Sequence, residues 1–284
     1  MNWFDEGALY SQIGAFLRED MGRGDITTQS IITRNTRARA RFVAGEKMVV
    51  AGLEAVEEVF LTLDSQLQLE AFAADGEEVE AGKVIARTVG FADVLLTGEQ
   101  VALNVLQHLS GIATLTRKYV DAIAGTKAQI VDARTTTPGL RQLEKYAVAT
   151  GGGLNSRFGL DDGVVITENH SFIVGSVTAA VKQAKEKLGY LHKIAVQISV
   201  ESELHQALAA GADVIMLDVS NAGDAAQLVK IAKDFSNSVI VECSGVIVLE
   251  NVREFAEAGA DLIRIDELTN SAPAALISFD LQLY

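Results

Sequence analysis

Arginine and acidic side chains in the second half of the sequence follow or end short apolar runs. Arg134 comes just after one run, and Asp218 and Glu242 end two others. A guanidinium group binds carboxylate or phosphate through paired hydrogen bonds. A carboxylate can hold a hard metal ion or transfer a proton. Together these residue types are typical of a site for a small acidic molecule.

The apolar runs that must position these side chains alternate with amphipathic stretches. The runs cover residues 129–132, 163–167, 194–199, 214–218, 239–242 and 262–265. The stretches with helical spacing cover residues 140–150, 176–188, 203–210, 222–234 and 249–258. Apolar strands alternating with helices predict βα units around a buried parallel sheet, and six such units can close into a barrel whose catalytic rim lies where the strands end.

A doubly wound sheet would instead need a glycine-rich loop straight after its first strand. The glycines at 151–153 follow a predicted helix, which favours the barrel and indicates a helix stop. The fold class is therefore α/β, an open (β/α) barrel with a smaller N-terminal α/β domain.

The first half of the sequence has mixed patterns. Helical spacing covers the first twenty residues and 51–63, strand alternation covers 37–43, and turn signals within 70–90 predict a β layer. A long helix is expected over 99–123, interrupted near Ser110-Gly111. The expected domains are 1–110 with the linking helix, 111–272 as the barrel, and a 273–284 tail that returns to the first domain.

The composition restricts the location and the partners. The formal charge of −14 argues against nucleic acid and anionic membranes as partners, because both attract basic surfaces. No apolar run reaches the roughly 18 residues that span a bilayer. The single cysteine, Cys243, excludes an internal disulfide, which favours the cytoplasm, and it is interpreted as a packed thiol rather than a nucleophile.

Several strings resemble those of the quinolinate phosphoribosyltransferase family (nicotinate-nucleotide pyrophosphorylase, carboxylating). They are Gly24-Asp25-Ile26-Thr27-Thr28, Leu109-Ser110-Gly111-Ile112-Ala113-Thr114, Thr136-Thr137-Pro138-Gly139-Leu140-Arg141 and Leu143-Glu144-Lys145-Tyr146-Ala147. The resemblance runs nearly end to end. It implies a homodimer, or a higher homo-oligomer, whose active sites take residues from both chains. It also implies phosphoribosyl transfer from phosphoribosyl pyrophosphate to quinolinate with release of CO₂, with Mg²⁺ as the one cofactor and no organic cofactor.

The resemblance assigns site residues by matching motifs. Arg134 and Arg157 correspond to dicarboxylate-binding arginines, although a structural salt bridge to Glu168, Asp218 or Glu242 is the alternative. Asp218 and Glu242 match acidic rim positions and are the catalytic candidates, while the metal ligands stay unknown. The remaining substrate-binding candidates are Thr135, Ser156, Thr167, Gln197, Ser244, Gly245 and Asn270.

Many of these positions depart from the family pattern in the same direction. Lysine, histidine or arginine is replaced at Gln100, Thr135, Ser156, Thr167 and Asn270. Gln197 replaces a glutamate, Val246 replaces the last glycine of a phosphate loop, and Asp266 adds a carboxylate. Losing three charge-assisted hydrogen bonds would cost about 5–9 kcal/mol of binding.

Three hypotheses follow. In the first, the chain is a divergent enzyme of this family that acts on a less anionic substrate pair. In the second, it is a catalytically silent paralogue used as a binding or regulatory subunit. In the third, it runs the ordinary quinolinate reaction with replacement cations such as Lys145, Arg141 or Lys193 reaching inward. The sequence leaves open whether catalysis is retained.

Overall fold

The structure, a computed structural model, describes residues 6–33 and 35–283, which form two compact units. One unit contains residues up to 117 together with 137–152 and the C-terminal residues from 271, and the other contains 118–136 and 153–270. The helix over 141–151 groups with the first unit although it follows a barrel strand in sequence.

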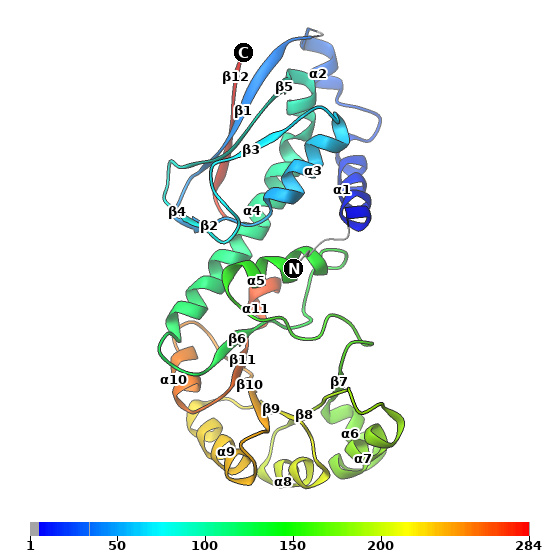
Figure 1. Cartoon of the computed structure of the whole chain (residues 1–284), viewed down its shortest axis with the longest axis vertical. Helices are drawn as coiled ribbons and strands as arrows, with labels where there is room; N and C mark the ends of the chain where they lie inside the picture. The colour runs from blue at the N-terminus through cyan, green and yellow to red at the C-terminus, as the bar shows by residue number, and fades with distance from the viewer. Residues whose placement is uncertain (1–5, 34, 284) are drawn as a thin grey trace. The chain divides into compact units, whose positions relative to one another are not determined.

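The first unit is built around a four-stranded antiparallel sheet in the order β12-β1-β5-β3. Its elements are α1 Glu6–Met21, α2 Ile26–Ile31, β1 Arg37–Ala44, β2 Met48–Val49, α3 Leu53–Leu63, β3 Leu69–Ala71, β4 Glu78–Val79, β5 Val84–Phe91, α4 Ala92–Ala122, α5 Arg141–Gly151 and β12 Ile277–Leu283, with the end of α4 beyond 117 in the other unit. The inward side chains of β1 are buried, whereas its arginines lie on the opposite, partly exposed face. The strand β12 pairs with β1, so residues 277–283 add an edge strand to the sheet of the first unit (Figure 1).

Asp25 caps the short helix α2 by accepting the Thr28 N–H at 3.0 Å. One sequence expectation in this unit needs correction. Helix α4 was expected to be interrupted near Ser110-Gly111, yet it is continuous. The hydroxyl of Ser110 accepts the Ala51 N–H at 3.1 Å, so this polar residue serves helix packing rather than a helix break.

The second unit contains a six-stranded parallel sheet in the order β6-β11-β10-β9-β8-β7, as the apolar runs predicted. Its elements are β6 Gln129–Val131, β7 Val164–Ile166, α6 Glu168–Val174, α7 Val177–Lys187, β8 Ile194–Ile198, α8 Glu201–Ala210, β9 Val214–Asp218, α9 Ala222–Phe235, β10 Ile240–Ser244, α10 Val252–Glu257, β11 Leu262–Arg264 and α11 Glu267–Asn270. Helices α7, α8 and α9 lie along the outer side of the strands (Figure 1).

Each barrel strand divides its side chains between two environments, because successive residues of a strand point to opposite faces. In β9, Ile215 and Leu217 are fully buried in the core, whereas Val214 and Met216 line a cavity on the other face. In the same way, Ala195 and Gln197 of β8 line that cavity while Val196 is fully buried. The alternation thus fixes which residue of each strand can reach a ligand.

Candidate active site

A cavity of about 500 Å³ opens among the strands of the second unit. Its wall is mostly apolar. The charged and polar side chains that line it are Arg134, Arg157, Lys193, Arg264, Glu242, Asn155, Ser156, Thr167 and Gln197. An apolar cavity with a few convergent polar groups is the usual form of a small-molecule site.

Cations outnumber acids in the lining of this cavity. Three arginines and Lys193 line it, against a single carboxylate, that of Glu242. Arg264 was not among the sequence candidates, because its run, 262–265, was interpreted as an apolar strand. The signal that could have identified it is one charged residue at an inward position of that strand. Of the three replacement cations considered, Lys193 lines the cavity, whereas Lys145 and Arg141 do not.

Arg134 and Arg157 influence each other across this cavity. The Arg157 side chain donates from Nη1 to the Gly163 carbonyl oxygen at 2.8 Å, which fixes its direction. Burial lowers the pKa of Arg157, and the positive charge of Arg134 lowers it further, while Asp162 opposes the shift. Two guanidinium groups that repel each other beside one cavity provide a suitable place for an anionic group.

Glu242 and Arg264 form the second charged feature of the cavity wall. Arg264 Nη1 lies 3.5 Å from Glu242 Oε1, and Arg264 Nε lies 3.4 Å from Asp266 Oδ1. Burial raises the pKa of Glu242, Arg264 lowers it, and Asp266 and Asp132 raise it. Glu242 Oε1 and Arg264 Nε, both buried, have no hydrogen-bond partner within the described part of the chain.

Three neutral side chains of the cavity wall already have hydrogen-bonding partners within the protein. The Ser156 hydroxyl and N–H donate to the buried Asp132 Oδ1 at 2.8 and 2.6 Å. Thr167 precedes α6, and its Oγ1 lies 2.7 Å from His170 Nδ1. Gln197 donates to Asp218 Oδ2 at 3.0 Å. His170 thus takes part in the N-terminal cap of α6.

Other predicted site residues do not line this cavity. Asp218 is exposed at the end of β9 and lines a smaller cavity of about 250 Å³. Thr135 is exposed, and its hydroxyl reaches the Asp266 carbonyl oxygen only at 3.4 Å. Ser244 is buried and donates to the Leu217 carbonyl oxygen at 3.1 Å. Asp218 and Ser244 end β9 and β10, whereas Thr135 lies in the loop after β6, and none of the three lines the cavity.

Gly245 and Asn270 complete the predicted set. Gly245 has a φ of +126°, and a Cβ there would lie 2.4 Å from the Val219 carbonyl oxygen, so backbone geometry alone requires glycine. Asn270 is exposed at the end of α11. Neither residue lines the cavity.

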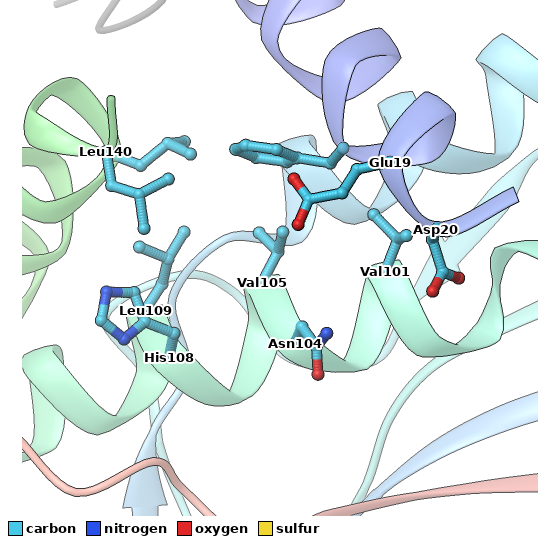
Figure 2. A pocket seen from close by; sticks show the side chains of 10 residues that line it. Glu19, Asp20, Val101, Asn104, Val105, His108, Leu109 and Leu140 are labelled. Carbon is cyan, nitrogen blue, oxygen red and sulfur yellow. The ribbon is translucent and has the colours of Figure 1, made fainter. Parts of the chain in front are cut away.

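The first unit has a cavity of its own, with the opposite electrostatic character. This cavity of about 420 Å³ lies between α1, α4 and the start of α5, with apolar walls that include Val105 and Leu140. Figure 2 shows Glu19 of α1 pointing into it over Val105, with His108 at the other end. His108 Nε2 lies 3.0 Å from Oε1 of the fully buried Glu144. Two carboxylates and no arginine or lysine line this cavity, so it does not suit an anionic substrate.

The single cysteine is expected to be chemically inert in the folded protein. Cys243 is fully buried, and burial, helped by Glu242 and Asp261, raises the pKa of its thiol to about 12. Since only the thiolate reacts, a disulfide reagent at pH 8 should label no thiol until denaturant is added, and then one per chain. Full labelling of the native protein within minutes would contradict this placement.

Within the described residues no group of three or more His, Cys, Asp or Glu side chains could hold a metal ion. In the same part of the chain, no helix has both the length and the apolar character that crossing a bilayer requires.

Comparisons with known proteins cover nearly the whole chain. The N-terminal domain of quinolinate phosphoribosyl transferase matches residues 25–110, and its C-terminal domain matches residues 112–282. The chain is 41% identical over 275 residues to a probable nicotinate-nucleotide pyrophosphorylase [carboxylating] of Bacillus subtilis (strain 168), covering 97% of this chain and 94% of that protein. A protein of the same name from Synechocystis sp. is 42% identical over 258 residues, covering 91% of this chain and 85% of that protein. The solved structure of the nicotinate-nucleotide pyrophosphorylase from Francisella tularensis superimposes with a TM-score of 0.93 at 34% identity, covering 98% of both chains.

Proposed function

Because this chain belongs to the quinolinate phosphoribosyltransferase family, we propose that it transfers a phosphoribosyl group to a pyridine carboxylic acid in the barrel cavity. Quinolinate is the proposed acceptor, as the names of its relatives suggest, and nicotinate mononucleotide, CO₂ and pyrophosphate are the proposed products. Such a step would serve NAD biosynthesis. The observation that carries the proposal is the cavity lined by three arginines and a lysine against one glutamate.

In this proposal Arg134 and Arg157 bind a carboxylate group of the acceptor. A hydrogen bond to a charged group is worth about 1.5–3 kcal/mol, and two guanidinium groups can orient one planar acid. The apolar wall, which includes Met216 and Val164, would pack against the ring. Binding both reactants in one cavity lowers the barrier by orientation, and Glu242 would face the positive charge that develops on the sugar.

A second candidate acceptor is an acid with one carboxylate. The observation that favours it is the neutral part of the cavity wall, where Ser156, Thr167 and Gln197 are already hydrogen-bonded within the protein. Such an acceptor matches the hypothesis of a less anionic substrate pair. A substrate with fewer negative charges needs fewer cations to offset the cost of its desolvation.

The side chains in the cavity, and Asp218 beside it, do not fit a Mg²⁺ ion held by the protein. Mg²⁺ requires oxygen ligands in octahedral geometry. The carboxylate of Glu242 faces the guanidinium of Arg264, and the carboxylate of Asp218 already accepts the Gln197 amide. No step of the proposed reaction is therefore assigned to a protein-held metal.

Turnover with two acids tests the proposal. The purified protein is incubated with phosphoribosyl pyrophosphate and either quinolinate or nicotinate, and nicotinate mononucleotide is measured by chromatography. The expected result is product from quinolinate with release of CO₂. Product from nicotinate alone, without CO₂, would support the acceptor with one carboxylate. No product from either acid, with a folded protein that still binds the acids in calorimetry, would favour the silent paralogue.

A further inference from the structure

The position of Arg264 follows from the strand register. On β11 it lies level with Val131 of β6, and Leu262, two residues earlier, lies level with Glu242 of β10. Leu262, Arg264 and Glu242 all line the cavity. The backbone of Arg264 therefore lies two residues nearer the carboxyl ends of the strands than the backbone of Glu242. The Arg264 side chain lies beside the Glu242 carboxylate.

Two carboxylates flank this guanidinium. Glu242 Oε1 lies 3.5 Å from Nη1, and Asp266 Oδ1 lies 3.4 Å from Nε. The Glu242 side chain is only 10% exposed and the Arg264 side chain 24%. An ionised carboxylate this deeply buried needs a positive charge nearby. The guanidinium group of Arg264, on the neighbouring strand β11, supplies that charge.

A divalent ion would compete with the guanidinium for the same carboxylate. It would lie beside a group of like charge, and Arg264 offers it only N–H donors, which cannot act as ligands. Asp218 is an exposed residue whose Oδ2 is already used by Gln197. The unused hydrogen-bonding capacity of Glu242 Oε1 and Arg264 Nε instead suits a neutral hydroxyl group or an anionic oxygen of a ligand.

We propose that Arg264 supplies, in place of a divalent cation, the positive charge between Glu242 and Asp266, so that the unliganded protein holds no Mg²⁺ or Mn²⁺ at the barrel cavity. Arg264 then acts as a positioning residue that keeps the Glu242 carboxylate ionised and directed into the cavity. This proposal concerns the barrel cavity, where the proposed function places the reaction. Only the part that Arg264 plays in that reaction rests on the proposed function.

Mn²⁺ binding, measured by electron paramagnetic resonance on the unliganded protein, tests this assignment. The wild type is expected to show no saturable site below millimolar Mn²⁺. Arg264→Ser leaves two carboxylates without their cation, so it is expected to bind one Mn²⁺ at least ten times more tightly. Adding Glu242→Gln to that variant should remove the gain.

Two further variants serve as controls. Arg264→Lys retains a positive charge and should exclude Mn²⁺ as the wild type does, which separates charge from packing. Arg253→Ser removes an exposed arginine of α10 that is paired with Glu257, and it should also behave as the wild type. Circular dichroism establishes that each variant is folded.

The result that would overturn the inference is one tightly bound Mn²⁺ in the wild type that Glu242→Gln abolishes. A folded Arg264→Ser protein with no gain in Mn²⁺ binding would also overturn it. Turnover is measured separately, so that a protein without activity but with the expected Mn²⁺ pattern would refute the proposed function and leave the role of Arg264 supported.

Discussion

Replacing Arg134 and Arg157 together by glutamine is expected to lower kcat/KM for the acid acceptor by about two to four orders of magnitude. Each guanidinium contributes a charge-assisted hydrogen bond of about 1.5–3 kcal/mol, and every 1.4 kcal/mol is a factor of ten. The loss should appear mainly as weaker acid binding, because both arginines line the cavity and neither contacts a carboxylate within the described residues. Steady-state kinetics measure it, and calorimetry with the acid alone gives a readout that does not depend on turnover.

The matched control is the double variant Arg253→Gln with Lys230→Gln. Both residues form exposed i,i+4 ion pairs on helices outside the cavity, with Glu257 and Asp234. This variant removes the same net charge from the protein, so it reports the long-range electrostatic effect alone. Equal losses in the two double variants would contradict a specific acid site at Arg134 and Arg157.

Replacing Gly111 by alanine is expected to lower the free energy of unfolding by about 1–3 kcal/mol, as overpacking in a core does. Gly111 lies within α4, where an added Cβ would lie 2.1 Å from the Pro273 carbonyl oxygen and 3.2 Å from Ala274 Cα. Both neighbours are backbone atoms of the segment that leads into β12, so α4 or this segment must move. Thermal unfolding followed by circular dichroism should show a lower Tm.

Gly14→Ala is the control for helix propensity. Gly14 is also helical, but its added Cβ would meet only the flexible end of Arg18, at 3.3 Å. Alanine is better than glycine within a helix by about 1 kcal/mol, so this variant should be as stable as the wild type or more stable. If Gly111→Ala also left the Tm unchanged or raised it, the close approach of α4 to Pro273 would be refuted.

The contrast between these two glycines shows what local sequence cannot reveal. Ser110 and Gly111 disfavour a helix by propensity, and the sequence accordingly predicted an interruption. In the structure Ser110 bonds to the Ala51 backbone, and Gly111 leaves room for the backbone at Pro273. Tertiary contacts outweigh a propensity difference of about 1 kcal/mol, and α4 continues through both residues.

The site could be predicted only in part, for a related reason. Parallel strands end at one edge of a sheet, so sequence runs alone placed Arg134, Gln197 and Glu242 near one another, and all three line the cavity. The same reasoning placed Asp218 at a strand end, but not the direction of its side chain, and Ser244 was a candidate only by resemblance. Asp218 is exposed outside the cavity lining, and Ser244 is buried against Leu217.

The sequence by itself determined the family and the parallel strands, because these depend on residue type and order along the chain. Only the tertiary structure decided the charge of the cavity. Arg264 of β11 and Lys193, which precedes β8, line the same cavity, where Arg264 faces Glu242. Charges act through space, so the electrostatic character of a site depends on which side chains the fold brings together.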